Sequence, residues 1–214
     1  MRNNKILNRL KTTLEAATAV QLVGVSGAFL IAVFLAVGLW NFGRESVAHF
    51  TGGLTTLALT AEDFEQIALS KTEDGKLVST DTDCQLLFSP QQKMSNVSFT
   101  AKYSVHPGEV TMYYTTKEGQ GFSATKRYRF FKEPGEENRY SVSFGVKKIQ
   151  DIRIDPTTAA GNEMEISEIV INTPKTFISF FSVGYGEIFD FIIYSGIIAS
   201  ILGFIKEMVI KKTN

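Results

Sequence analysis

The stretch VSFTAKYSV, from Val97 to Val105, decides the fold class of this chain. Every second residue is apolar or aromatic, and the residues between them are serine, threonine or lysine. Strict alternation of this kind predicts a β-strand with one buried face, because successive side chains of a strand point to opposite faces. The predicted buried face consists of Val97, Phe99, Ala101, Tyr103 and Val105.

The same alternation recurs through the middle of the 214-residue chain, and turn residues separate the runs. Further predicted strands contain Leu86 to Phe88; Val110 to Thr116; Phe122, Ala124, Tyr128 and Phe130; Tyr140, Val142 and Phe144; Ile152 and Ile154; Met164 and Ile166. Turns are predicted at 106–109, 117–119, 133–135 and 160–162, where Gly, Pro and Asn gather. About eight or nine short strands, with no helical period between them, predict an all-β antiparallel sandwich of jelly-roll or immunoglobulin type over residues 45–175.

Two apolar segments frame this domain. Residues 16–43 contain no charged side chain, and Trp40 lies near the far end of the run. The run exceeds the roughly 20 residues that cross a bilayer, so it predicts a transmembrane helix. A signal peptide cleaved after a small residue near Gly38 is the alternative, but the apolar core is longer than a signal peptide needs. Whether the segment is cleaved stays open.

The second apolar segment, residues 188–210, predicts a second transmembrane helix or an interfacial one. Its uncharged core, Phe191 to Ile205, is short, and Lys206 and Glu207 interrupt the segment after it. The flanking segments, 1–15 and 211–214, are basic. By the positive-inside rule both termini face the cytoplasm, which places the sandwich on the outer side of a bacterial membrane.

Small residues at four-residue spacing mark one face of each predicted helix. They are Gly24, Ala28, Ala32 and Ala36 in the first helix, and Ser195, Ala199 and Gly203 in the second. Such stripes let helices approach closely in lipid. They predict either that the two helices pack on each other or that they dock on a second copy or on a larger membrane protein.

The composition excludes several function classes. The formal net charge is zero, so nothing indicates a nucleic-acid partner. One cysteine, Cys84, and two histidines leave no metal-site spacing, and a buried Cys84 is favoured over a reactive thiol. We find no nucleophile elbow and no phosphate-binding loop, and acidic residues such as Glu62 read as solvated surface. We therefore expect no catalytic residues, no metal and no cofactor.

One sequence patch has the residue types of a binding site. Cations and aromatic residues alternate from Lys126 to Phe131, and a tyrosine pair precedes them. Aromatic rings beside polar groups can stack on sugars, although an outward ring can also pack under a loop. The candidate ligand-binding residues are Tyr113, Tyr114, Arg127, Tyr128, Arg129 and Phe131.

The last two predicted strands carry a resemblance. Ile149-Gln-Asp-Ile-Arg-Ile-Asp-Pro156, then Gly161, then Met164-Glu-Ile-Ser-Glu-Ile-Val-Ile171 resembles the closing strands of jelly-roll, carbohydrate-binding-like domains of bacterial cell-envelope glycosyltransferases and polysaccharide-assembly proteins. The match covers about 23 residues and indicates a fold more than a site. It implies a glycan-related envelope role. A shift of phase between Ile166 and Ile169 also predicts a β-bulge.

The stretch SVGYGEIFDF, Ser182 to Phe191, gives the main alternative. Val183 to Gly186 matches the core of a potassium-channel filter, and it lies between the two apolar segments. Only Lys175 to Phe181 is left for a pore helix, so a glycine-containing joint over 176–187, with Tyr185 at the membrane surface, is the favoured interpretation.

The sequence as a whole predicts a non-catalytic, membrane-anchored accessory protein of envelope glycan synthesis or glycosyl transfer. Its sandwich is expected to bind glycan or a partner enzyme such as a glycosyltransferase. A tetrameric potassium-channel subunit and a structural or sensory ectodomain remain as alternatives.

Overall fold

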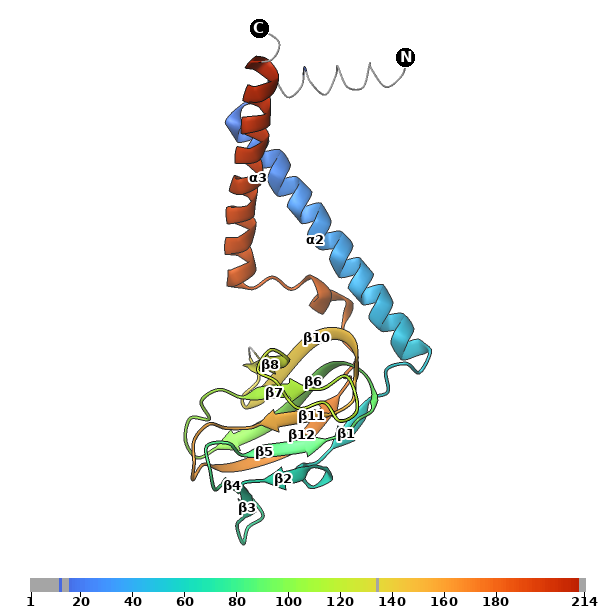
Figure 1. Ribbon diagram of the computed structural model, residues 1–214, viewed down its shortest axis with the longest axis vertical. Helices are drawn as coiled ribbons and strands as arrows, with labels where there is room; N and C mark the ends of the chain where they lie inside the picture. The colour runs from blue at the N-terminus through green and yellow to red at the C-terminus, as the bar shows by residue number, and fades with distance from the viewer. Residues whose placement is uncertain (1–11, 13–15, 134, 212–214) are drawn as a thin grey trace. The chain divides into compact units, whose positions relative to one another are not determined.

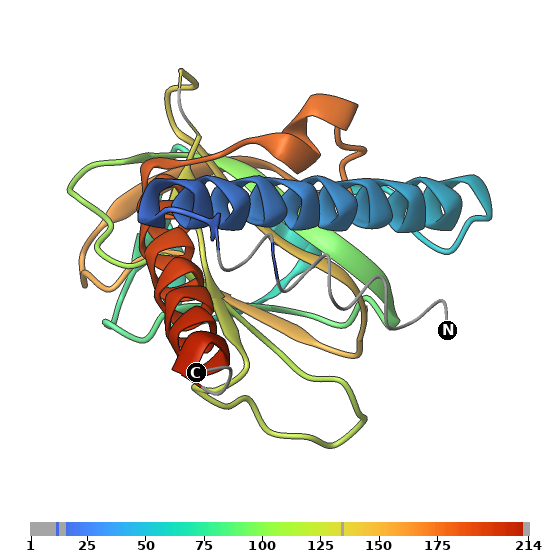
Figure 2. The same cartoon turned by 90° about the horizontal axis from the view of Figure 1, so that it is seen from above.

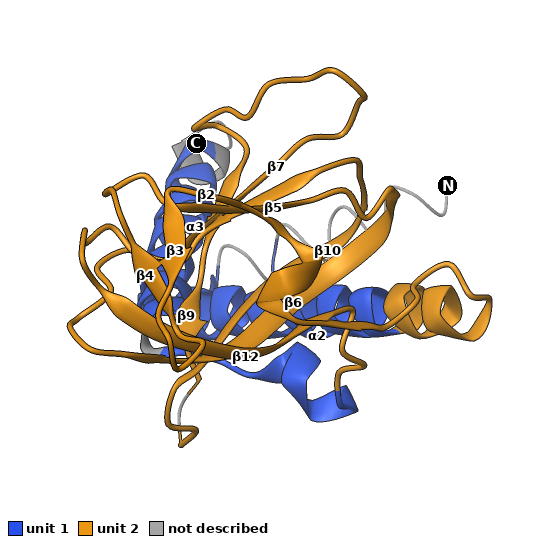
Figure 3. Cartoon of the chain, turned by 90° about the horizontal axis from the view of Figure 1, so that it is seen from below, with its two compact units in different colours: residues 1–42, 176–214 blue, residues 43–175 orange. Residues whose placement is uncertain are grey.

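The computed structural model describes residues 12, 16–133 and 135–211 of the chain. The chain divides into two compact units, residues 1–42 with 176–214 and residues 43–175 (Figure 3). The first holds two long helices and the second holds the β-strands. The predicted basic segment 1–15 lies outside the described residues apart from Thr12, as do residues 212–214 of the predicted tail and the side chain of Tyr185.

The unit formed by residues 43–175 is a sandwich of two antiparallel sheets (Figure 1). In chain order its elements are β1 (Leu57–Leu59), η1 (Ala61–Asp63), β2 (Glu65–Ile67), β3 (Leu69–Lys71), β4 (Leu77–Ser79), β5 (Gln85–Phe88), β6 (Gln92–Tyr103), β7 (Thr111–Tyr114), β8 (Arg127–Arg129), β9 (Phe131–Lys132), β10 (Arg139–Ile149), β11 (Ile152–Asp155) and β12 (Glu163–Ile171).

The strand order identifies the sandwich as a jelly roll. One sheet runs β3-β4-β12-β6-β10-β9, with β1 beside β12, and the other runs β2-β5-β11-β7-β8. The eight strands from β4 to β12 other than β9 therefore form two four-stranded layers, β4-β12-β6-β10 and β5-β11-β7-β8. This interleaving of the chain between two sheets is the double Greek key of a jelly roll. The predicted antiparallel β-sandwich is confirmed.

The inner faces of the two sheets enclose one hydrophobic core. The predicted inward face of β6 contributes Val97, Phe99 and Ala101, each at most 2% exposed. Val105 was predicted to share that face, but it is exposed, because β6 ends at Tyr103 and the chain turns away after it. The buried core consists of Phe64, Leu86, Met94, Val97, Phe99, Ala101, Val110, Met112, Phe130, Val142, Ile149, Ile152, Ile154, Ile169 and Ile171.

Two irregularities shape the seven-stranded sheet. The register between β12 and β6 shifts between Ile166 and Ile169, which is the predicted bulge. A second shift lies between Ser143 and Lys147 of β10, where Gly145 has a φ of 69°. The strand prediction also failed at Phe122 and Ala124, which lie in the loop before β8. Only the three residues of β8 in this predicted strand pair with a neighbour, which the alternation alone did not reveal.

Buried polar residues join the two ends of this unit. The carboxylate of Glu45 accepts a hydrogen bond from Ser95 Oγ at 3.0 Å, and Lys175 Nζ lies 3.3 Å from its other oxygen. Asn172, with a φ of 59° and no exposed surface, bonds to Ser95, Thr55 and Lys93. We call Glu45, Ser95, Asn172 and Lys175 the polar clamp. It fixes the first and last segments of the unit to β6.

The other unit contains most of α2 (Ala19–Phe50), with η2 (Phe177–Phe181) and α3 (Tyr185–Lys211). Both long helices are long and apolar enough to cross a membrane by length and composition. Thr18 and Gln21 form a capping box at the start of α2, with Thr18 N bonded to Gln21 Oε1 at 2.8 Å and Gln21 N to Thr18 Oγ1 at 3.3 Å. Figure 2 shows α2 as one unbroken helix. It continues seven residues beyond the predicted end at Gly43, because Arg44 to Phe50 keep helical backbone bonds.

The second half of the VGYG stretch is the beginning of α3. Tyr185 and Gly186 are helical, and the carbonyl of Gly184 accepts the Ile188 N–H at 3.2 Å. Glu187 Oε2 accepts the Gly184 N–H at 2.9 Å, as the third residue of a helix does when it closes the N-terminus. A filter needs these carbonyls free for an ion, so the potassium-filter alternative is wrong. The glycine joint was expected to need a positive φ at its glycines. Neither Gly184 nor Gly186 is among the described glycines with positive φ, so that reason is wrong.

Candidate functional site

The outer face of the five-stranded sheet carries a row of paired side chains. Strand register places one residue of each strand opposite the next, which puts all five on the same face. Neighbouring strands lie about 4.8 Å apart, so the row extends over roughly 19 Å. In order across the sheet it consists of Glu65, Leu87, Arg153, Tyr113 and Arg127.

Arg153 is fixed at the centre of this face by two carboxylates. Its Nε donates to Asp155 Oδ1 at 2.7 Å and its Nη2 donates to Asp155 Oδ2 at 2.8 Å. Asp83, just before β5, also accepts a hydrogen bond from Nη2. Burial raises the pKa of Asp155 above its usual range, and the Arg153 charge offsets part of that effect. The hydrogen bond to Asp155 raises the pKa of Arg153.

Tyr113 lies between two arginines on this face. The Arg153 guanidinium carbon is 5.1 Å from the centre of the Tyr113 ring, within the range of a cation–π contact. On the other side, Arg127 is the direct register partner of Tyr113, and a hydrogen bond from its guanidinium to the phenol raises the pKa of Arg127. Arg129 projects from the same face of β8 opposite Thr111. We call Tyr113, Arg127, Arg129, Arg153 and Asp155 the arginine–tyrosine face.

The structure divides the six predicted ligand-binding residues among three places. Tyr113, Arg127 and Arg129 belong to the arginine–tyrosine face. Tyr114 and Tyr128 have the opposite strand phase and pack against the core, with ring centres 5.4 Å apart and an interplanar angle of 11°. Phe131 belongs to β9 in the other sheet and is 67% exposed. Adjacent residues of a strand cannot share a face, which is why the patch does not come together.

The two inward tyrosines belong to an aromatic group that the sequence patterns did not reveal. Phe144 of β10 stacks on Tyr128 with ring centres 4.8 Å apart. Lys147 Nζ lies 5.0 Å from the Tyr128 ring centre and 5.4 Å from that of Tyr114. It also bonds to the Tyr128 hydroxyl, which raises the pKa of Lys147. This group packs between β8 and β10. Its rings contact each other and Lys147, so they are not free to stack on a ligand.

The predicted helix-packing residues lie on different sides of the helix contact. In α3, Ser195 and Ala199 are at most 9% exposed, and Gly203 lies near Leu22 of α2. In α2 the predicted stripe Gly24, Ala28, Ala32 and Ala36 is exposed. Within residues 19–42 of that helix the buried positions are Leu22, Ser26 and Gly38 instead. An offset of two residues turns a helix by about 200°, so α2 presents the opposite face to α3.

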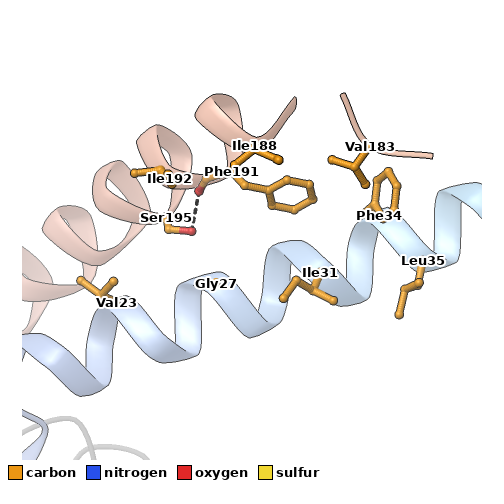
Figure 4. A pocket seen from close by; sticks show the side chains of 10 residues that line it. All are labelled: Val23, Gly27, Ile31, Phe34, Leu35, Val183, Ile188, Phe191, Ile192 and Ser195. Atoms are coloured by element: carbon orange, nitrogen blue, oxygen red, sulfur yellow. Dashed lines mark hydrogen bonds between the residues drawn. The ribbon is translucent and has the colours of Figure 1, made fainter. Parts of the chain in front are cut away.

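Larger residues accompany the small ones at this helix contact (Figure 4). The Phe34 and Phe191 rings meet edge to face with centres 5.6 Å apart. Beside them lies an apolar groove of about 560 Å³. Ser195 lines it, but its hydroxyl donates to the Phe191 carbonyl of its own helix at 2.6 Å. Nothing polar is therefore offered to a ligand there.

Over the described part of the chain, no group of three or more His, Cys, Asp or Glu side chains could hold a metal ion. Cys84 is fully buried beside the Thr157 carbonyl, and burial raises the pKa of its thiol. A neutral, enclosed thiol is a poor nucleophile. The arginine–tyrosine face itself carries guanidinium, phenol and carboxylate groups, which can bind a polar ligand.

No family model and no curated protein matches this chain. Solved structures that resemble it include the C-terminal CBM6 of LamC, a marine laminarinase from Zobellia galactanivorans, with 14% identity, 56% of this chain and 100% of that chain covered, and a TM-score of 0.36. They also include the low-affinity xylan-binding module CBM86 from Roseburia intestinalis, with 10% identity, coverage of 55% and 94%, and a TM-score of 0.35. The jelly-roll assignment rests on the strand order of the two sheets and not on these distant likenesses.

Two residues of this face, Arg153 and Asp155, were missing from the predicted site. They stand in the run Ile152-Arg-Ile-Asp155, whose alternation puts both on the outer face of a strand. That signal was present in the sequence. The sequence pattern did not show which strand lies beside β11, because its partner β7 is 38 to 44 residues away in the chain.

Proposed function

We propose that this chain is a non-catalytic, membrane-anchored glycan-binding protein of the bacterial cell envelope. Helices α2 and α3 would cross the inner membrane with both termini in the cytoplasm. The jelly roll would lie on the outer side and present the arginine–tyrosine face to a glycan. Its role would be to assist a larger membrane protein, such as a glycosyltransferase.

The placement of Tyr113 between Arg127 and Arg153 carries the proposal. A tyrosine ring offers a sugar an apolar surface for stacking and a polar edge. Guanidinium groups donate hydrogen bonds to sugar hydroxyls, and carboxylates accept hydrogen bonds from them. The Asp155 contacts hold Arg153 in one orientation. A preorganised polar group loses less conformational entropy on binding, which favours recognition of a weakly binding ligand.

The charges favour a glycan that carries carboxylate groups. Arg153 is neutralised by Asp155 and Asp83. Arg127 and Arg129 project from the same face of edge strand β8. Within the described residues, neither of them forms an ion pair. Planar guanidinium groups match carboxylates in a two-bond geometry. An acidic polysaccharide would place its sugar rings along the row and its carboxylates at β8.

The exposed apolar helices support the membrane anchor. Only 17% of the most apolar part of the first candidate span and 11% of that of the second are buried within the protein. Large side chains such as Trp40, 71% exposed, and Ile192, 65% exposed, cover their surfaces. A soluble protein would leave such surfaces in water at a large cost in hydrophobic free energy, whereas a bilayer would cover them.

Binding of oligosaccharides to the full chain in non-ionic detergent tests the proposal. Oligogalacturonate should bind, and neutral xylo-oligosaccharides of the same length should bind more weakly. Tyr113→Ala should weaken binding at least about tenfold, given the usual value of a stacked aromatic residue. Arg127→Gln with Arg129→Gln should reduce binding of the acidic ligand only.

Phe131→Ala provides the matched control, because it removes an exposed aromatic ring from the other sheet. Unchanged binding in Tyr113→Ala, or equal losses in Tyr113→Ala and Phe131→Ala, would refute the proposed face. The partner role has its own test. Affinity purification from native membranes should recover an envelope glycosyltransferase, and its absence would count against the accessory role alone.

A further inference from the structure

A polar pocket lies at the end of α2, away from the arginine–tyrosine face. It has a volume of about 330 Å³ and is built from the last turns of the helix and from strands β6 and β10. All of its residues belong to the unit 43–175. The lining residues are Arg44, Val47, Ala48, Thr51, Lys93, Val146 and Lys148.

Three of these residues carry positive charge and none carries negative charge. Lys93 and Lys148 are direct register partners on adjacent antiparallel strands. Like charges placed directly opposite each other destabilise a sheet. Arg44 is held beside them by a hydrogen bond from Nη2 to the Val146 carbonyl at 2.9 Å. Among the residues that the structure describes, no carboxylate forms an ion pair with any of the three. The pocket therefore concentrates charge that the protein does not neutralise.

The lysines are not needed to complete the helix end. Cations near a helix C-terminus often satisfy its free carbonyl groups. Here the carbonyls of Val47, Ala48 and His49 already accept hydrogen bonds from the N–H groups of Thr51, Leu54 and Gly52, at 2.9 to 3.1 Å. The helix is closed by backbone bonds, so capping does not account for the two lysines.

The position of the pocket along α2 indicates its ligand. Arg44 is the first charged residue after the uncharged run 16–43, and Trp40 precedes it by about one helical turn. If the run crosses a bilayer, Arg44 comes at the depth of the lipid headgroups, where tryptophan is also enriched. We propose that Arg44, Lys93 and Lys148 bind a phosphate group, carried either by an anionic lipid headgroup or by a soluble phosphate ester.

Trp40 is the only tryptophan of the sequence and precedes Arg44 by four residues on α2, so its fluorescence reports on lipid beside that part of the helix. The full chain is placed in nanodiscs that contain phosphatidylcholine with a small fraction of lipid brominated on its acyl chains. Bromine quenches tryptophan fluorescence on contact. Brominated phosphatidylglycerol should quench Trp40 with a relative association constant at least about fivefold higher than that of brominated phosphatidylcholine, because each juxtamembrane lysine adds about fivefold.

The double variant Lys93→Gln, Lys148→Gln should lower that ratio at least about fivefold, since it removes two of the three charges and leaves Arg44. It keeps the backbone carbonyl of Lys93, which Asn172 contacts. The control Lys117→Gln, Lys132→Gln removes the same charge from two exposed lysines elsewhere and should keep the ratio. A wild-type ratio of one, together with no binding in the soluble arm below, overturns the proposal.

The soluble arm separates the two phosphate sources. Glycerol 1-phosphate is added to the full chain in a non-ionic detergent, and its phosphorus resonance is followed by NMR. Broadening that the Lys93, Lys148 double variant abolishes and the control retains identifies a soluble ester as a ligand. Binding of a lipid headgroup phosphate rests on the proposed membrane anchor. If neither brominated lipid quenches Trp40, the anchor fails, and the soluble arm alone decides whether the phosphate site exists.

Discussion

Arg153 and Asp155 stand two residues apart on β11 and meet through two parallel hydrogen bonds of 2.7 and 2.8 Å on the outer face of the sheet. Their side chains are 19% and 14% exposed. The pair is therefore more enclosed than a surface salt bridge, and removing one partner leaves the other poorly solvated.

Arg153→Met should lower the free energy of unfolding of the sandwich by about 1–3 kcal/mol, because it leaves the Asp155 carboxylate without its charged donor. Lys102→Met is the control, since Lys102 and Glu165 form an exposed pair at 3.5 Å. That substitution should change stability by less than about 1 kcal/mol. Denaturant titration of the two variants compares them, and equal losses would contradict the enclosed-pair argument.

Cys84 should report on unfolding of the sandwich. The thiol is fully buried and its pKa is raised by burial, so both access and thiolate formation are suppressed in the folded state. Labelling with a thiol reagent near neutral pH should be slow without denaturant and should accelerate through the same transition that circular dichroism detects. Rapid stoichiometric labelling of the native protein would show that the site opens locally.

Asn172 should be a sensitive position of the polar clamp. Its side chain satisfies the Ser95 N–H and the carbonyls of Thr55 and Lys93, at 2.9 to 3.0 Å. Asn172→Gly tolerates the positive φ but loses all three contacts, so a loss of about 3 kcal/mol or more is expected. Asn138→Gly is the control for backbone effects, because Asn138 also has a positive φ but is partly exposed. Similar stabilities of the two variants would refute the role of the side chain.

Tyr103 should make the sandwich sensitive to alkali. Burial strongly raises the pKa of its phenol, whose hydroxyl donates to the Pro156 carbonyl at 2.9 Å. The unfolded phenol ionises near pH 10 while the folded phenol stays neutral. The contribution of this group to the free energy of unfolding is thus fully present below about pH 10. Above that pH it should fall by about 1.4 kcal/mol per pH unit.

Tyr103→Phe should remove that part of the pH dependence, at the cost of about 1 kcal/mol at neutral pH from the lost hydrogen bond. Denaturant titrations at several pH values between 8 and 11.5 measure both effects. An unchanged slope in the variant would assign the alkaline sensitivity to other groups.

Local patterns predicted the strands better than they predicted which residues meet. The alternation of Val97, Phe99 and Ala101 is visible in consecutive residues, and so is the change of phase at Ile166 and Ile169 that marks the bulge. Both features depend on one strand and its pleat. The jelly-roll order, by contrast, depends on pairings such as β4 with β12, which are far apart in the chain.

The candidate site shows the same division. Tyr113 and Arg127 are brought together by the β7–β8 register, and Arg153 joins them only through β11. The tyrosine pair Tyr113 and Tyr114 looked like one patch in the sequence, but the pleat sends the two rings to opposite sides of the sheet. In α2, small residues occur on more than one face, and burial at Ser26 and Gly38 selects a face that spacing alone did not indicate.

The polar clamp has a consequence for how the protein can be rearranged. Glu45 and Lys175 are 130 residues apart in the chain, and Lys175 Nζ lies 3.3 Å from Glu45 Oε2, so the first and last segments of the jelly roll lie near each other. A domain with adjoining ends can be inserted into a short connection or excised from it without stretching what remains. The jelly roll can thus be excised or grafted as one piece, because its first and last segments are joined to each other.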